Sequence, residues 1–177
     1  TRNAINIKPD DPTVHFNLGN ILRDNGKLKE AEVSMRKAIE INPSYVNALA
    51  NLGNIFIKQG KLKEAEISLR EAIRLNPDFA EAHNNLSNIL LRIHNFKEGW
   101  NEYEWRLKAN KGYSQIILKT TKPRWRDHSD CTLLLWREQG IGDEIIFASF
   151  IPKLTENVDQ LIVKVDQRLI PLFKRSF

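Results

Sequence analysis

The sequence predicts a mostly α-helical protein, a solenoid of helix–turn–helix repeats followed by a truncated βαβ segment. Two observations indicate the solenoid. The chain aligns with itself at an offset of 34 residues, and "GKLKEAE" occurs verbatim at 26–32 and at 60–66. A period of this length, made of two helical patterns, is typical of stacked helix pairs. A third observation indicates the βαβ segment, because helical periodicity gives way to short apolar runs after Lys108.

The repeated positions have physical reasons. Gly19 and Gly53 lie inside the first helix of their repeats, where a small residue lets the second helix approach closely. Gly26 and Gly60 follow these first helices, at the place where a left-handed residue ends a helix. Prolines in register close each repeat, because the residue before a proline disfavours the helical conformation. They are Pro9, Pro43 and Pro77.

These features resemble the tetratricopeptide repeat (TPR) family, in which a Leu-Gly pair, an Ala-x6-Ala spacing and a closing proline recur. The resemblance implies three repeats, at 12–45, 46–79 and 80–110. Residues 1–11 then correspond to the end of a preceding TPR. We therefore expect the sequence to be a fragment that begins within a longer solenoid. It starts with Thr1 rather than Met, so any N-terminal targeting segment is expected to be missing.

Pairs of asparagines recur in the first helices, which in TPR proteins line a concave groove. The candidate binding residues are Asn17, Asn20, Asn51, Asn54, Asn85 and Asn88. A ladder of side-chain amides offers both donors and acceptors to the backbone of an extended peptide. It resembles the asparagine ladder of the protein O-GlcNAc transferases, so the expected partner is a peptide or protein in the groove. The same amides can instead bond neighbouring helices or water, and both interpretations stay open.

The charges near this groove argue against one TPR function. TPR domains that clamp a C-terminal carboxylate carry basic residues on the first helix of the third repeat. Glu81 and Asn85 occupy the corresponding positions here, so we expect no carboxylate clamp. Basic residues elsewhere in the first helices are interpreted as ordinary solubilising charge; they are Arg23, Lys58 and Arg92.

The third repeat departs from the pattern and continues as "GWNEYEWRLK". Its aromatic residues indicate either a last repeat that covers an exposed end or docks another domain, or side chains that fill the solenoid core. Core filling explains Trp100 and Tyr103 well but Trp105 poorly. Exposed solenoid ends also predict possible self-association.

Beyond the repeats we expect a linker at 111–130 and a partial domain at 131–177. Within it, 131–138 and 159–166 have the apolar character of strands, and 143–154 reads as an amphipathic helix. Strand, glycine loop, helix and strand form a βαβ unit, which implies a parallel sheet.

The loop "EQGIGDE" carries the second resemblance. The succession "GWNEYEWR", "KPRW" and "LLLWREQGIGDEIIFASFIPKL" resembles bacterial TPR proteins with a heptosyltransferase-like domain of the Rossmann-like (GT-B) fold. That resemblance implies a parent glycosyltransferase in which Asp143 is the catalytic base. The associated loop residues are Glu138, Gln139, Gly140 and Gly142. Alternatively, Asp143 only caps the following helix. A nucleotide-sugar would bind in the parent, whereas the fragment is expected to hold no cofactor and to be inactive.

The composition narrows the remaining possibilities. It is 41% hydrophobic and 28% charged, with a mean hydropathy of −0.44 and no apolar run of the roughly 18 residues that a membrane helix needs. The net charge of +5 comes from basic residues interspersed with acidic ones, so we expect neither a membrane nor a nucleic-acid partner. The histidines show no metal-ligand spacing, which predicts no metal site. The single cysteine, Cys131, fits a reducing, cytoplasmic compartment.

Overall fold

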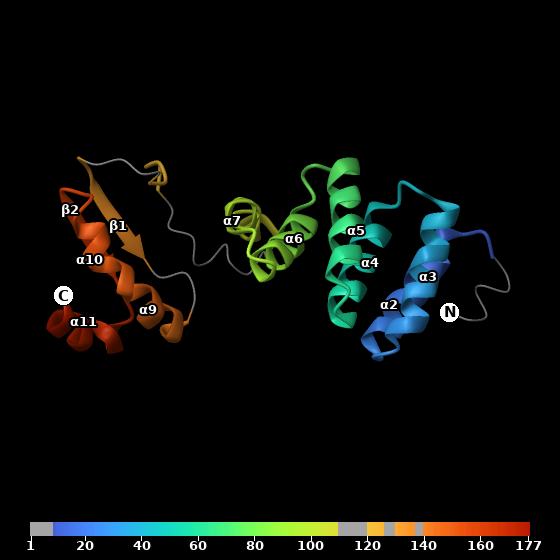
Figure 1. The fold of residues 1–177 in the computed structure, drawn as a ribbon, viewed down its shortest axis with the longest axis horizontal. Helices are drawn as coiled ribbons and strands as arrows, with labels where there is room; N and C mark the ends of the chain where they lie inside the picture. Colours follow the sequence, from blue (N-terminus) through green and yellow to red (C-terminus); the bar gives the residue numbers. More distant parts are fainter. Residues whose placement is uncertain (1–8, 110–119, 126–129, 137–139) are drawn as a thin grey trace. The chain divides into compact units, whose positions relative to one another are not determined.

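A computed structural model describes residues 9–109, 120–125, 130–136 and 140–177. The chain divides into two compact units, 1–111 and 112–177. Each unit is treated by itself below. The first is helical, and the second contains a small parallel sheet (Figure 1).

The first unit consists of antiparallel helix pairs that follow one another along the chain (Figure 1). The pairs are α2 (Pro12–Asp24) with α3 (Leu28–Ile41), α4 (Val46–Gln59) with α5 (Leu62–Leu75), and α6 (Ala80–Arg92) with α7 (Phe96–Tyr103), followed by α8 (Arg106–Ala109). Each helix packs on its pair partner and on the next pair. The predicted mostly helical solenoid of helix–turn–helix repeats is confirmed.

The turns inside the pairs require a left-handed residue. Gly26 and Gly60 take φ values of 75° and 77° there. His94 occupies the same repeat position in the third pair and takes a φ of 64°, although it has a Cβ atom. An L-residue in this region is strained, so the third turn is less favourable than the first two.

The core lies between the paired helices, where the predicted close approach is observed. A Cβ atom added at Gly19 would lie 2.8 Å from Cε of Met35, and one at Gly53 would lie 2.7 Å from Cγ of Leu69. Both contacted side chains are fully buried. Ala65 on the second helix, whose backbone oxygen would lie 3.4 Å from the same Cβ at Gly53, is also fully buried. The two helices of a pair are therefore as close as glycine permits.

The aromatic residues of the third pair differ from the prediction. Trp100 is 53% exposed, whereas Trp105 is half-buried and stacks on His83, with ring centroids 4.1 Å apart. The expectation that core filling suits Trp100 better than Trp105 was therefore wrong. The cause is that α7 ends at Tyr103, so the chain turns at Trp105, which lies against α6 just before α8 packs on the same helix.

The second unit contains β1 (Thr132–Trp136) and β2 (Gln160–Lys164), which pair in parallel with Thr132 opposite Gln160. The elements between and after the strands are α9 (Ile141–Phe147), the 3-10 helix η2 (Ala148–Phe150), α10 (Ile151–Thr155), η3 (Gln167–Leu169) and α11 (Ile170–Ser176). The predicted parallel pair is confirmed. The expected continuous helix at 143–154 was wrong, since helical structure begins at Ile141 and is interrupted by η2.

Candidate functional site

The six predicted asparagines lie on the first helices α2, α4 and α6, on the side away from the core. Gly19, Leu52 and Leu86, each adjacent in sequence to one of these asparagines, are buried or line the core. The amides themselves reach solvent: Asn17 and Asn88 are exposed and the other four are half-buried. Because α4 contacts both α2 and α6, the three helices form one continuous row. We call the surface made by these six asparagines the amide face.

Two of the asparagines bond each other across the first repeat boundary. Asn51 Nδ2 on α4 donates to Asn20 Oδ1 on α2 over 2.8 Å. Within the described part of the chain, the side chains of the other four, Asn17, Asn54, Asn85 and Asn88, make no hydrogen bond. Of the two interpretations left open by the sequence, bonding between helices therefore applies to one pair, and four amides keep their donors and acceptors available.

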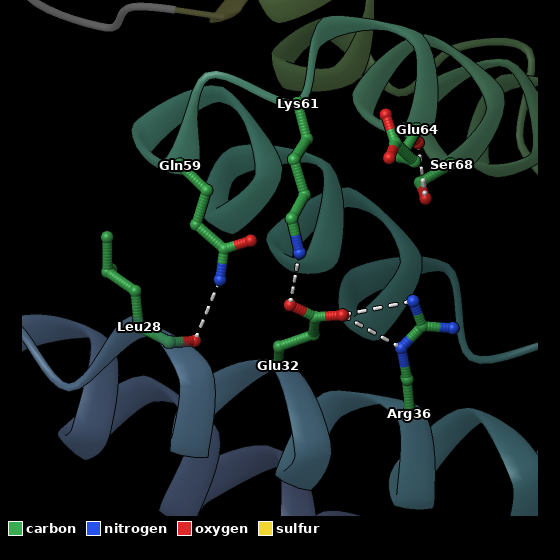
Figure 2. Close-up of polar contacts among 7 residues, drawn as sticks. All are labelled: Leu28, Glu32, Arg36, Gln59, Lys61, Glu64 and Ser68. Atoms are coloured by element: carbon green, nitrogen blue, oxygen red, sulfur yellow. Dashed lines mark hydrogen bonds and ion pairs between the residues drawn. The ribbon is translucent and has the colours of Figure 1, made fainter.

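Contacts at the ends of the helices fix the first repeat against the second (Figure 2). Gln59, the last residue of α4, donates from Nε2 to the backbone oxygen of Leu28 over 3.3 Å. Glu32 on α3 accepts from Lys61 Nζ of the second repeat at 3.1 Å and from Arg36 of its own helix at 3.0 Å. Arg36 and Lys61 also lie over the ring of Phe56, 5.5 and 5.4 Å from its centroid. This cluster holds the end of α4 and the turn after it against α3.

The contacts of Glu32 stabilise the charged form of its carboxylate. Burial alone would raise its pKa, but hydrogen bonds led by that from Lys61 hold the pKa of Glu32 below its ordinary value. An analogous contact joins the second and third repeats, where Arg70 on α5 bonds Glu98 on α7 over 2.7 Å. The hydrogen bond from Arg70 is the main reason that the pKa of Glu98 is also lowered.

Charge is distributed unequally between the two layers of helices. The second helices α3 and α5 each carry three acidic and three basic residues. In contrast, the only acidic residues of the first helices are Asp24 and Glu81, and α4 has none. The amide face therefore belongs to a layer that is rich in amides and poor in negative charge.

A buried histidine supports the third repeat. His83 Nε2 donates to the carbonyl oxygen of Pro77 over 2.9 Å, and its Nδ1 contacts the carboxylate of Glu102. His15 makes the same contact with the carbonyl of Pro9, at 2.7 Å. This repeat position therefore anchors the first helix to the proline turn before it, which gives these histidines a structural role.

The predicted loop residues of the second unit are partly described. Gly140 is the N-cap of α9, Gly142 lies in its first turn, and the Asp143 carboxylate accepts from the Gly140 N–H over 3.2 Å. Asp143 thus makes a capping bond from inside the helix. Glu138 and Gln139 lie outside the described residues. Glu144 Oε2 accepts from the backbone N–H of Asp166 over 2.9 Å, which ties α9 to the segment after β2.

Two general searches cover the described residues only. No helix among them is long and apolar enough to cross a membrane. They also contain no group of three or more histidine, cysteine or acidic side chains arranged to hold a metal ion.

Comparison with known proteins finds matches within the helical unit. Residues 19–60 and 53–93 match the family model described as TPR repeat. Protein FlbA of Caulobacter vibrioides (strain ATCC 19089 / CIP 103742 / CB 15) is 33% identical over 84 residues, which are 45% of this chain and 14% of that protein. The chain thus spans only a small part of this relative.

Solved structures with the same fold are more distant in sequence. The TPR protein YrrB, described as having an unusual peptide-binding site, is 21% identical with a TM-score of 0.59, over 64% of this chain and 59% of its own. The first TPR of Spaghetti (RPAP3), bound to an HSP90 peptide, is 21% identical with a TM-score of 0.54, over 56% of this chain and 79% of its own. At these identities the likeness shows the TPR fold.

Proposed function

We propose that this chain, whose residues 19–93 form TPR repeats, is a scaffold that binds an extended segment of a partner protein on the amide face. The observation that carries the proposal is the set of four available amides, Asn17, Asn54, Asn85 and Asn88, on one row of helices. An amide can donate to a backbone carbonyl and accept from a backbone N–H, so a row of them suits a peptide regardless of its side chains. Peptide-bound TPR structures with the same fold are consistent with this role.

The bound segment would lie mainly over α4 and α6. Asn51 and Asn20 are already joined to each other by one hydrogen bond, whereas Asn54, Asn85 and Asn88, which make none within the described residues, lie on these two helices. A peptide placed there would also lie on the part of the row that carries no acidic residue except Glu81.

The test is a selection of displayed random peptides on the full chain. Selected peptides are synthesised with a fluorophore and their affinities measured by anisotropy for the wild type and for a triple variant, Asn54→Ala, Asn85→Ala and Asn88→Ala. Loss of three hydrogen-bonding amides predicts at least about tenfold weaker binding, at about 1 kcal/mol for each bond. Asn101→Ala, an exposed asparagine on α7, is the matched control and should bind like the wild type. Peptides that bind the triple variant as tightly as the wild type would place recognition elsewhere.

We propose a second function for the parent protein, that of a glycosyltransferase whose TPRs select the acceptor. What supports it is the parallel β1–α9–β2 arrangement, with Asp143 in the first turn of the helix that follows β1. Asp143 would accept the proton of the acceptor hydroxyl. The hydroxyl oxygen would then bond to the sugar as the nucleoside diphosphate leaves. Calorimetric titration of nucleotide-sugars into the full-length parent, with turnover compared in Asp143→Asn, tests this proposal. Absence of binding to every donor would refute it.

Self-association through exposed ends of the solenoid stays a separate prediction. Ile93, Phe96 and Trp100, near the end of the described repeats, are 46–53% exposed. Sedimentation velocity at several protein concentrations would detect it.

A further inference from the structure

Two cations on the first helices have no acidic partner. Lys58 and Arg92 lie in the last turns of α4 and α6, are exposed, and make no ion pair within the described part of the chain. The other arginines of the described helices α2–α8 all do: they are Arg23, Arg36, Arg70, Arg74 and Arg106. Among the arginines of these described helices, Arg92 is thus the one without an ion pair, and Lys58 lies on α4, which has no acidic residue.

Favourable interaction with the helix dipole does not account for this difference. A cation in the last turn of a helix is stabilised by the partial negative charge of the free carbonyls. However, Arg74 lies in the last turn of α5 and nevertheless bonds Glu71 over 2.7 Å. A position at a helix end therefore does not by itself leave a cation unpaired.

The acidic residues of the first helices cannot neutralise these cations. Asp24 is held by Arg23 at 2.9 Å. Glu81 lies in the first turn of α6, and at 1.5 Å per residue it is about 16 Å from Arg92 along the helix axis. Lys58 and Arg92 therefore face solvent as uncompensated positive charges.

Both cations share a face with the available amides. Lys58 follows Asn54 by four residues, and Arg92 follows Asn88 by four, so each cation lies one helical turn beyond an amide. The helices that carry them are in contact. Packed helices lie about 8–10 Å apart, and one turn of an extended polyproline II segment spans this distance with three residues at about 3.1 Å each. Side chains three residues apart in such a segment lie on the same side.

We infer that the amide face recognises an acidic segment of a partner protein in an extended, polyproline II conformation, with carboxylate side chains three residues apart at Lys58 and Arg92. The amides hold the backbone of the segment and the cations select its side chains. This inference rests on the proposed peptide-binding function and adds the class of peptide. It also replaces the interpretation of Lys58 and Arg92 as charges that only maintain solubility.

The first test is the composition of the peptides selected on the full chain, which should be enriched in aspartate and glutamate over the unselected library. The probe for the second test is the tightest selected peptide with an amidated C-terminus, compared with a copy in which its acidic residues are changed to glutamine. The copy should bind the wild type about 5- to 10-fold more weakly, as expected for two exposed ion pairs. The acidic peptide should also be the more sensitive to added salt.

The variant Lys58→Gln/Arg92→Gln locates the effect. This variant should bind the acidic peptide more weakly by the same factor and should bind the glutamine copy with the affinity of the wild type, as in a double-mutant cycle. Lys29→Gln/Lys63→Gln removes the same charge from unpaired lysines on the second helices, so it should bind both peptides like the wild type. A third peptide, with a free C-terminus and no acidic side chain, distinguishes a terminal carboxylate from acidic side chains.

The outcomes separate this inference from the function on which it rests. Peptides that need the amides but show no acidic enrichment would overturn the inference and leave the binding function standing. Equal losses in the two charge variants would also overturn it, because net charge would then explain the effect. Tighter binding of the peptide with the free C-terminus would assign recognition to a terminal carboxylate instead. Absence of any peptide dependent on the amides would overturn both proposals.

Discussion

Replacing Gly53 with alanine tests the close approach of α4 to α5. Asn51 and Asn54 of the amide face lie on α4, so this packing helps to hold them in place. In an open helix this change stabilises a protein by about 1 kcal/mol, because alanine is the better helix former. Here the new methyl group would lie 2.7 Å from Cγ and 3.0 Å from Cδ2 of Leu69. Leu69 is fully buried, so it has little room to move away.

The clash should outweigh the helix propensity. Extra methyl groups in a well-packed core cost about 1–3 kcal/mol. With the propensity gain subtracted, we expect Gly53→Ala to lower the free energy of unfolding by up to about 2 kcal/mol. Leu69→Ala removes the atoms that clash and leaves a cavity. In that background Gly53→Ala should therefore be neutral or stabilising, although Leu69→Ala alone costs about 2–5 kcal/mol.

Urea unfolding followed by far-UV circular dichroism measures all four proteins of this cycle, and an unchanged m-value shows that they unfold alike. Gly142→Ala is the control, since its added methyl group meets nothing within 4 Å. Stabilisation by Gly53→Ala in the wild-type background would refute the reasoning, because it would mean that α4 and α5 separate at no cost. Equal effects in both backgrounds would show that Leu69 is not the obstacle.

Three further changes test other contacts. His94→Gly relieves the left-handed strain at φ 64° and should raise the free energy of unfolding by about 1 kcal/mol, measured as a rise in melting temperature. Glu32→Gln should lower the free energy of unfolding by about 0.5–1 kcal/mol at neutral pH. Because the pKa of Glu32 is lowered in the folded state, the stability it supplies is present above its unfolded pKa of about 4.3 and is lost as pH falls through the folded value. Urea midpoints of the wild type and Glu32→Gln should therefore converge in acid. Trp105→Ala removes the stack on His83 and should cost about 1–2 kcal/mol in the same urea assay, whereas the exposed Trp100→Ala should cost less.

The sequence predicts the helical repeats well because local rules and the global period agree. Small residues at Gly19 and Gly53, and left-handed glycines at Gly26 and Gly60, each have a purely local reason that the 34-residue period repeats. Where the 34-residue pattern is lost, in the third repeat, local rules do not predict which side chains face the core. The burial of Trp105 depends on α7 ending at Tyr103, which is a property of packing between helices.

Contacts between repeats were the least predictable part of the candidate site. The asparagines were identified from their spacing, but which of them bond each other depends on the distance between α2 and α4. The same holds for the absence of ion pairs at Lys58 and Arg92 within the described residues, which depends on where the acidic side chains of the neighbouring helices lie. The sequence pattern places these two cations among the solubilising charges, and a comparison of acidic residues on first and second helices could have shown that they lack nearby acidic residues.

The bond between Asn51 and Asn20 leads to a last prediction. Asparagines of the repeated motifs should differ in role, because one pair bonds across a repeat boundary and the others, within the described residues, do not. Asn20→Ala removes the acceptor, leaves the Asn51 amide without its partner and should lower the free energy of unfolding by about 1 kcal/mol. If the site lies over α4 and α6, peptide affinity should nevertheless stay within about twofold of the wild type, a difference below 0.5 kcal/mol. Asn85→Ala should show the reverse, with weaker peptide binding and nearly unchanged stability, since its side chain makes no hydrogen bond within the described residues. Urea unfolding and peptide anisotropy on both variants separate the two roles. Equal loss of affinity in both would mean that the segment extends over all three first helices, and that the bonded pair opens to receive it.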